Sequence, residues 1–239
     1  MGRMTRWNAG SVVLALTALL GGCTGVIPGE EPRPPSVVAD AGGFEVRRGR
    51  PGLVIGVPDA GSDLGVSRDL ARLTGFGLVA VTDGRRAGSE MRGAVERASL
   101  PARVHGDAYG RRVVEAAQGA ILLYVEVQGQ DRAARAMGLD IGTVGLSSED
   151  AWRLKTLFEL IRDSRLGGAD GAPPLAITVA KWDAFRAPGV AAARSPSGPE
   201  RALYIGLPRS ARTTYRETYT GILADFLLQS VTVLVPRQR

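Results

Sequence analysis

Short apolar runs alternate with amphipathic stretches from about residue 44 to the end of the chain. Continuous apolar runs of about 4–8 residues between turn residues are typical of buried strands. The most strand-like run covers residues 120–127, so we expect it to form a central strand of a sheet. Further strands are predicted at residues 53–57, 77–82, 141–146, 175–179, 202–205 and 231–235.

Amphipathic helices are predicted between these strands, at residues 67–73 and 107–118, after Ser147 and after Thr214. Ser147-x-x-Asp150 and Thr214-x-x-Glu217 both have the spacing of a capping box, in which side chains bind the free N–H groups at the start of a helix. Apolar residues at helical spacing mark the faces that we expect to be buried. They are Tyr109, Val113, Val114 and Ala117, then Ala151, Leu154, Leu157, Phe158 and Ile161, then Tyr219, Ile222, Leu223, Phe226 and Leu227.

Strands that alternate with helices predict an α/β fold. We expect three layers, with a mostly parallel or mixed central sheet and helices on both faces. Residues 46–239 are long enough to form one well-buried domain. The polar stretch 83–100 and the Pro/Gly/Ser-rich stretch 186–200 are predicted to be loops.

The first residues have the three-part pattern of a secretory signal. A basic start with Arg3 and Arg6 precedes an apolar run at 11–20, which is too short to span a bilayer as a permanent helix. Leu20-Gly-Gly-Cys23 resembles the bacterial lipoprotein box, and this resemblance implies cleavage before Cys23, lipidation of its thiol and acylation of the new amino terminus. We therefore expect residues 1–22 to be a signal peptide.

A lipid on Cys23 would attach the protein to a membrane of the bacterial cell envelope, because several acyl chains hold a protein far better than one. Thr24 follows Cys23, where some inner-membrane lipoproteins have Asp, so the outer membrane is favoured. Residues 23–45 are rich in Pro, Gly and Glu and are predicted to be a flexible linker.

Composition excludes several kinds of function. Without Arg3 and Arg6 the chain has 28 basic and 24 acidic side chains, a net charge of +4, and its arginines are scattered. Nucleic acid is therefore not an expected partner. Cys23 is the only cysteine, so a disulfide, a cysteine-based zinc site and a cysteine nucleophile are all excluded once it is lipidated.

Three predicted strand ends carry polar motifs: Pro58-Asp-Ala-Gly-Ser-Asp63, Tyr124-Val-Glu-Val-Gln-Gly-Gln130 and Leu207-Pro-Arg-Ser210. In their order and spacing, over roughly residues 53–228, they resemble the N-formylglutamate amidohydrolase family. The resemblance implies a zinc carboxypeptidase-like, or phosphorylase/hydrolase-like, α/β fold. It also implies zinc-dependent hydrolysis of an amide bond.

The chain departs from this family pattern at three positions. The family has His where this chain has Asp59 and Gln128, and commonly has Glu where this chain has Gly206. The resemblance implies that those histidines bind zinc and that the Glu acts on water. A neutral Gln amide is a poor zinc ligand and Gly has no side chain, so no metal ion and no other cofactor are expected.

Other residues leave alternatives open. Asp59, Asp63 and Glu126 offer oxygen ligands for a hard cation, although both aspartates can instead bind the backbone of the turn at Gly61. His105 is the only histidine, and is either a ligand or base supplied by a loop or a histidine at the surface. Ser62 and Ser210 lack a neighbouring base that would make either a nucleophile.

Arg85, Arg97 and Arg209 have the planar guanidinium that binds carboxylates, but solvated surface arginines give the same pattern. The first hypothesis is a lipid-anchored binding or structural module that has lost zinc chemistry and recognises a small acidic or peptide-like ligand near Asp59, Glu126 and Arg209. The second is an active metal-dependent amidohydrolase or peptidase with a remodelled site, for which zinc would be the cofactor. The third is a scaffold for an unidentified protein of the envelope.

Overall fold

The computed structural model describes residues 37–39, 43–58, 64–82, 101–130, 138–167, 171–181 and 201–235. All of these belong to one compact unit, Pro34–Arg239. Several predictions lie outside the described residues: the signal peptide, the loops at 83–100 and 186–200, and the candidate residues Cys23, Asp59, Asp63, Arg85 and Arg97.

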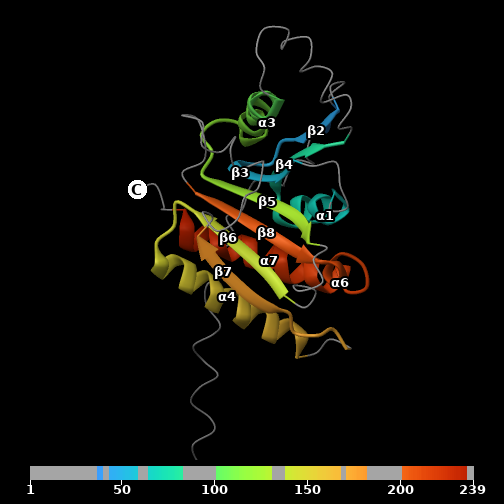
Figure 1. Cartoon of the computed structure of the whole chain (residues 1–239), viewed down its shortest axis with the longest axis vertical. Helices are drawn as coiled ribbons and strands as arrows, with labels where there is room; N and C mark the ends of the chain where they lie inside the picture. Colours follow the sequence, from blue (N-terminus) through green and yellow to red (C-terminus); the bar gives the residue numbers. More distant parts are fainter. Residues whose placement is uncertain are drawn as a thin grey trace, which may run out of the picture. The chain divides into compact units, whose positions relative to one another are not determined.

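A mixed eight-stranded sheet forms the middle layer (Figure 1), in the order β1-β2-β4-β3-β5-β8-β6-β7. Strands β3, β4, β5 and β8 run parallel to one another, and β6 is antiparallel to β8. The apolar run predicted to be central supplies β5, which pairs with β3 on one side and β8 on the other. The strands are β1 (Val37–Ala39), β2 (Phe44–Arg47), β3 (Arg50–Val57), β4 (Phe76–Val81), β5 (Leu123–Gln130), β6 (Gly138–Val144), β7 (Ala176–Lys181) and β8 (Ala202–Pro208).

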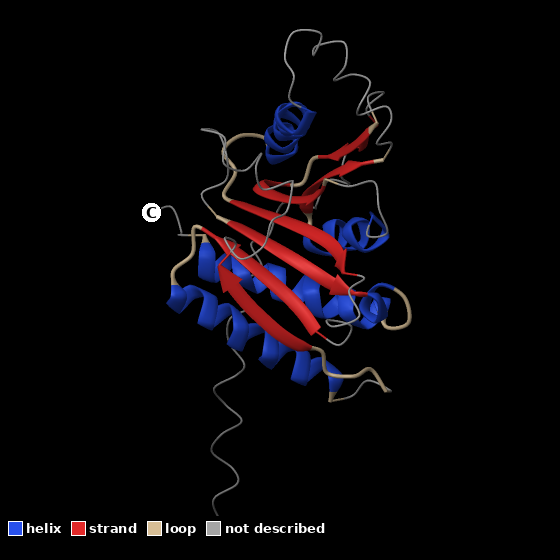
Figure 2. Ribbon diagram, viewed as in Figure 1, coloured by secondary structure: helices blue, strands red, loops and turns tan. Residues whose placement is uncertain are grey.

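Helices lie on both faces of the sheet, which confirms the predicted three-layer α/β fold (Figure 2). One face packs against α1 (Leu64–Thr74), α4 (Ser148–Leu166) and α7 (Arg216–Leu234), and together they form the larger hydrophobic core. The other face packs against α3 (Pro101–Ala117), which covers β2, β4 and β3. A single turn of helix, α6 (Arg209–Arg212), follows β8.

Strand β5 shows how the pattern of the sequence sets these layers. Successive side chains of a strand point to opposite faces. Leu123, Val125 and Val127 therefore enter the larger core. The alternate positions, from Tyr124 to Gln130, face the side of the sheet that carries α3 and are polar.

The folded unit begins before residue 46, which corrects the predicted linker of residues 23–45. Strand β1 pairs with β2, and β2 pairs antiparallel with β4. Phe44 and Val46 of β2 are buried against α3, with ring centroids of Phe44 and Tyr109 6.4 Å apart. These strands are held by contacts with residues that are distant in the sequence. The Pro/Gly-rich composition around them gave no local signal for a strand.

Two predictions at the C-terminal end are wrong. Residues 231–235 do not close the sheet, because α7 continues through Leu234 and buries that side chain in the larger core. The Thr214-x-x-Glu217 capping box does not form either, since α7 begins after Tyr215, which makes no side-chain cap. The buried face predicted for this helix is confirmed at Tyr219, Ile222, Leu223, Phe226 and Leu227.

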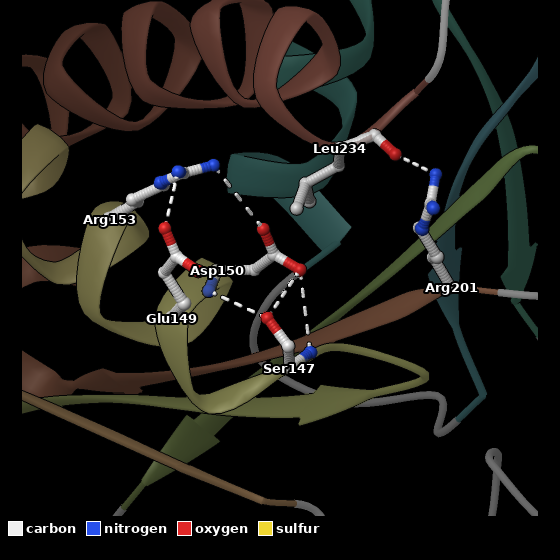
Figure 3. Close-up of polar contacts among 6 residues, drawn as sticks. All are labelled: Ser147, Glu149, Asp150, Arg153, Arg201 and Leu234. Carbon is white, nitrogen blue, oxygen red and sulfur yellow. Dashed lines mark hydrogen bonds and ion pairs between the residues drawn. The ribbon is translucent and has the colours of Figure 1, made fainter.

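The capping box at α4 does form. The backbone N–H of Asp150 donates to the Ser147 hydroxyl at 3.0 Å, and that hydroxyl donates to the Asp150 carboxylate at 2.8 Å (Figure 3). The bond from Ser147 is the main cause that lowers the pKa of Asp150 below its usual value. In the same view, Arg201, directly before β8, donates to the carbonyl of Leu234, the last residue of α7. The start of α4 and the end of α7 are thus each closed by a side chain.

In α3 the predicted inward face is correct at Tyr109 and Val113, but Val114 is 38% exposed.

None of the helices within the described residues is both long and apolar enough to cross a membrane.

Candidate functional site

A row of polar side chains lies on the sheet face that carries α3, next to that helix. It is made of Tyr124, Glu126, Gln128 and Gln130 on β5, Tyr204 on β8 and Asp140 on β6. The register places these residues on one face, because Glu126 pairs with Tyr204, Gln128 with Gly206, and Gly206 with Asp140. We call this set the polar row.

Helix α3 joins the polar row through Tyr109. The hydroxyls of Tyr109 and Tyr124 are 3.1 Å apart, and the Tyr109 hydroxyl also donates to the Val79 carbonyl at 3.2 Å. The Tyr124 hydroxyl donates to Oε2 of Glu126 at 3.3 Å. These three contacts link α3 and β4 with the Glu126 carboxyl, and the two phenols share two protons among them.

Gly56 on β3 makes room for this chain. A Cβ on Gly56 would lie 2.1 Å from the Tyr124 hydroxyl and 2.5 Å from that of Tyr109. Both distances are far shorter than a van der Waals contact. The missing side chain at residue 56 therefore lets the two tyrosines meet.

Gln128 lies between a carboxylate and a phenol. Its Nε2 donates to Oε1 of Glu126 at 3.3 Å, and its Oε1 accepts a hydrogen bond from the Tyr204 hydroxyl at 3.1 Å. The amide nitrogen can face only an acceptor and the oxygen only a donor, so the two partners fix how the amide is turned. The oxygen of Gln128, its one possible metal-ligating atom, is already held by the protein.

The space above Gly206 is filled by another residue. A Cβ on Gly206 would lie 1.7 Å from Nε2 of Gln130 and 2.6 Å from its Cδ. From this position Nε2 of Gln130 donates to Oδ2 of Asp140 at 3.0 Å. The end of the polar row is thus closed by an amide that bridges from β5 across β8 to β6.

Burial affects the ionisation of Tyr124 in the row. Glu126 is fully buried and Asp140 is 5% exposed. Burial raises the pKa of Tyr124 well above its usual value, and the neighbouring Tyr109 hydroxyl and Glu126 carboxyl act in the same direction. Tyr124 is therefore a neutral hydrogen-bond donor at physiological pH.

These side chains do not fit the zinc site that the family resemblance implies. Gln128 is a neutral amide engaged at both ends, and Gly206 has no side chain in the space that Gln130 fills. Within the described residues no group of three His, Cys, Asp or Glu side chains is arranged to hold a metal ion. A catalytic zinc ion usually takes three such ligands.

The sequence-predicted candidates are only partly brought together. Glu126, Gln128 and Gly206 lie side by side in the row. Arg209 is exposed at the start of α6, directly after β8. His105 lies on α3, but its side chain is outside what the structure describes, as are Asp59 and Asp63.

The roles of Gln130, Asp140, Tyr109 and Tyr204 were not predicted from the sequence. The alternation of polar residues from Tyr124 to Gln130 was a usable signal, since it marks one face of a strand. Asp140 gave no signal, because it lies just before the apolar run that was predicted as a strand.

No family model matches the chain, and the search of curated proteins found no significant match. Three solved structures are similar to it. A gene product of Agrobacterium tumefaciens is 14% identical with a TM-score of 0.47, over 80% of this chain and 94% of that one. An N-acetylmuramoyl-L-alanine amidase of Nostoc punctiforme is 14% identical with a TM-score of 0.38, over 77% of this chain and 99% of that one. A metallo-carboxypeptidase of Burkholderia cenocepacia is 12% identical with a TM-score of 0.41, over 79% of this chain and 60% of that one.

Proposed function

We propose that this chain is a lipid-anchored protein of the bacterial cell envelope whose α/β domain is a binding or structural module rather than a zinc amidohydrolase. The proposal combines the resemblance of its motifs to the N-formylglutamate amidohydrolase family with the chemistry of the polar row. It gives Cys23 the role of lipid attachment site. It gives the residues at the family's metal and acid/base positions a structural role.

The bonding of Gln128 is the observation that supports the proposal best. Where the family has a histidine, this chain has an amide that donates to Glu126 and accepts from Tyr204. Replacing a ligand by a neutral amide lowers metal affinity, and the hydrogen bond from Tyr204 already uses one of the two lone pairs of the amide oxygen. The Gln128 amide therefore binds other members of the row at both ends.

The candidate ligand contacts divide into two kinds. Glu126 is fully buried, so its part in the proposed function is to hold Tyr124 and Gln128. Arg209 is exposed, and its guanidinium is suited to the carboxylate of a small acidic or peptide-like ligand. Arg85 and Arg97 are proposed to assist it.

Metal analysis and hydrolysis assays of the purified full chain, kept in detergent, test this proposal. We expect less than stoichiometric zinc after incubation with zinc salts and dialysis, and no hydrolysis of N-acyl amino acids with added metal. Stoichiometric zinc that is lost in Glu126→Gln or Asp59→Asn variants, together with hydrolysis, would establish a remodelled enzyme instead. Thr214→Ala is a matched surface control for either variant.

A further inference from the structure

Gly206 lies in the middle of a line of three residues that crosses three strands. Gln128, Gly206 and Asp140 are direct cross-strand partners on β5, β8 and β6. Neighbouring strands are about 4.8 Å apart, so a side chain at residue 206 would stand between the other two. Because residue 206 is glycine, it places no side-chain atom there.

Gln130 occupies that place from a diagonal position. Its Nε2, Cδ and Cγ lie 1.7, 2.6 and 3.0 Å from where a Cβ on Gly206 would be. Its amide is held there by the hydrogen bond to the buried Asp140 carboxylate. The two residues therefore exclude one another: any side chain at residue 206 displaces the Gln130 amide.

We propose that Gln130 is a positioning residue that replaces the missing side chain of residue 206 and keeps the gap beside Asp140 closed to cations. This inference rests on the proposed function, because it explains how a former metal-binding row is maintained without a metal. The conformation of Gln130 is therefore coupled to the size of residue 206. Asp140 is the carboxylate that accepts the hydrogen bond of the Gln130 amide.

The geometry determines which changes are compatible. A Cβ at residue 206 displaces the Gln130 amide and breaks its hydrogen bond to Asp140. In a chain without the Gln130 side chain, the same Cβ breaks no such bond. Removing the Gln130 side chain opens a gap next to Asp140. A carboxylate placed at residue 206 would then lie beside Asp140, and paired carboxylates bind hard cations such as Mn²⁺.

The first test is a double-mutant cycle of Gly206→Ala and Gln130→Ala on the full chain, followed by thermal unfolding. Contacting residues couple strongly, so we expect Gly206→Ala to lower the Tm by about 3–6 °C in the natural chain and by less than half of that in the Gln130→Ala background. An equal loss in both backgrounds overturns the proposal. Zinc uptake by the natural chain would contradict the proposed function but leaves this comparison unaffected.

The second test measures Mn²⁺ binding. We expect the Gln130→Ala/Gly206→Glu chain to bind Mn²⁺ at least ten-fold more tightly than the natural chain, and to lose this gain when Asp140→Asn is added. Gly206→Glu alone should not gain affinity, because the Gln130 amide and the new side chain compete for one space. Equal gains with and without Gln130, or no gain in the double variant, overturn the proposal.

Discussion

At the scale of single residues, Gly56 lies where two buried tyrosine hydroxyls meet. Gly56→Ala would place a methyl group onto the Tyr109–Tyr124 contact, and the rigid rings cannot yield as a flexible chain can. We expect it to lower the free energy of unfolding by about 1–3 kcal/mol, the usual cost of overpacking. Urea denaturation followed by circular dichroism measures this.

The matched control is Gly221→Ala in α7, where a Cβ would meet nothing within 4 Å. Replacing an interior helix glycine by alanine raises stability by about 0.5–1 kcal/mol. Equal effects of the two substitutions would contradict the role given to Gly56.

The buried Tyr124 phenol predicts a loss of stability at alkaline pH. Its pKa is raised in the folded chain, so its contribution is fully present below the unfolded value of about 10 and is lost as the pH rises toward the folded value. Between these values stability falls by about 1.4 kcal/mol per pH unit from this group. Tyr124→Phe should remove that slope, as measured by urea unfolding between pH 8 and 11. A slope unchanged in the variant would mean that other groups cause the alkaline loss.

At the scale of helices and strands, two sequence motifs with the same capping-box spacing had different outcomes. Ser147-x-x-Asp150 forms a capping box at α4, whereas Thr214-x-x-Glu217 does not, because the chain turns through residues 213–215 before α7 begins. Ser147→Ala should therefore cost about 1 kcal/mol of stability, and Thr214→Ala should be neutral. Thermal unfolding of both variants measures the difference.

The stability cost of Ser147→Ala at low pH tests the same prediction. The pKa of Asp150 is lowered, mainly by the bond from Ser147, so its contribution is present above pH about 4 and is lost as the pH falls through the folded value. The cost of Ser147→Ala should shrink below pH 4. A cost that is constant with pH would show that the carboxylate takes no part in the cap.

The elements that the sequence predicted correctly are those with a clear local period. The inward stripe of α7 and the apolar run of β5 are examples, since burial follows directly from their spacing. The run at 231–235 is rich in β-branched residues and was predicted as a strand. It is helical as far as Leu234, because that side chain packs into the core and tertiary packing overrides a weak local preference.

The polar row shows why the candidate site was only partly predictable. Glu126 and Gln128 could be placed from a strand-end motif, because residues two apart on a strand share a face. The bridge from Gln130 over Gly206 to Asp140 crosses strand β8, which is distant in sequence from both β5 and β6. No local pattern encodes such a bridge.

At the scale of the whole molecule, the order of the strands brings the row together. Strand β8 is the last in sequence but lies between β5 and β6, so it places Tyr204 and Gly206 between side chains from the middle of the chain. The residues of the polar row on β5, β6 and β8 therefore come from separate strands, and β8 is distant in sequence from the other two. They act as one unit only in the folded protein.

The lipid predicted on Cys23 would attach the whole molecule to a membrane. Cys23→Ser should release the protein from the membrane fraction of the bacterium that produces it and abolish incorporation of labelled fatty acid. Sedimentation of membranes followed by mass spectrometry of the N-terminal peptide measures both. Membrane association that persists in the Cys23→Ser variant would show that the lipid box is not the anchor.

The most direct test of the central claim is a crystal structure of the chain grown with excess zinc, with anomalous scattering measured at the zinc edge. We predict no anomalous peak within ligand distance of Glu126, Gln128 or Asp140, and the Gln130 amide hydrogen-bonded to Asp140 above Gly206. A strong peak bound by Glu126 or Asp140, with the Gln130 amide displaced, would contradict the account.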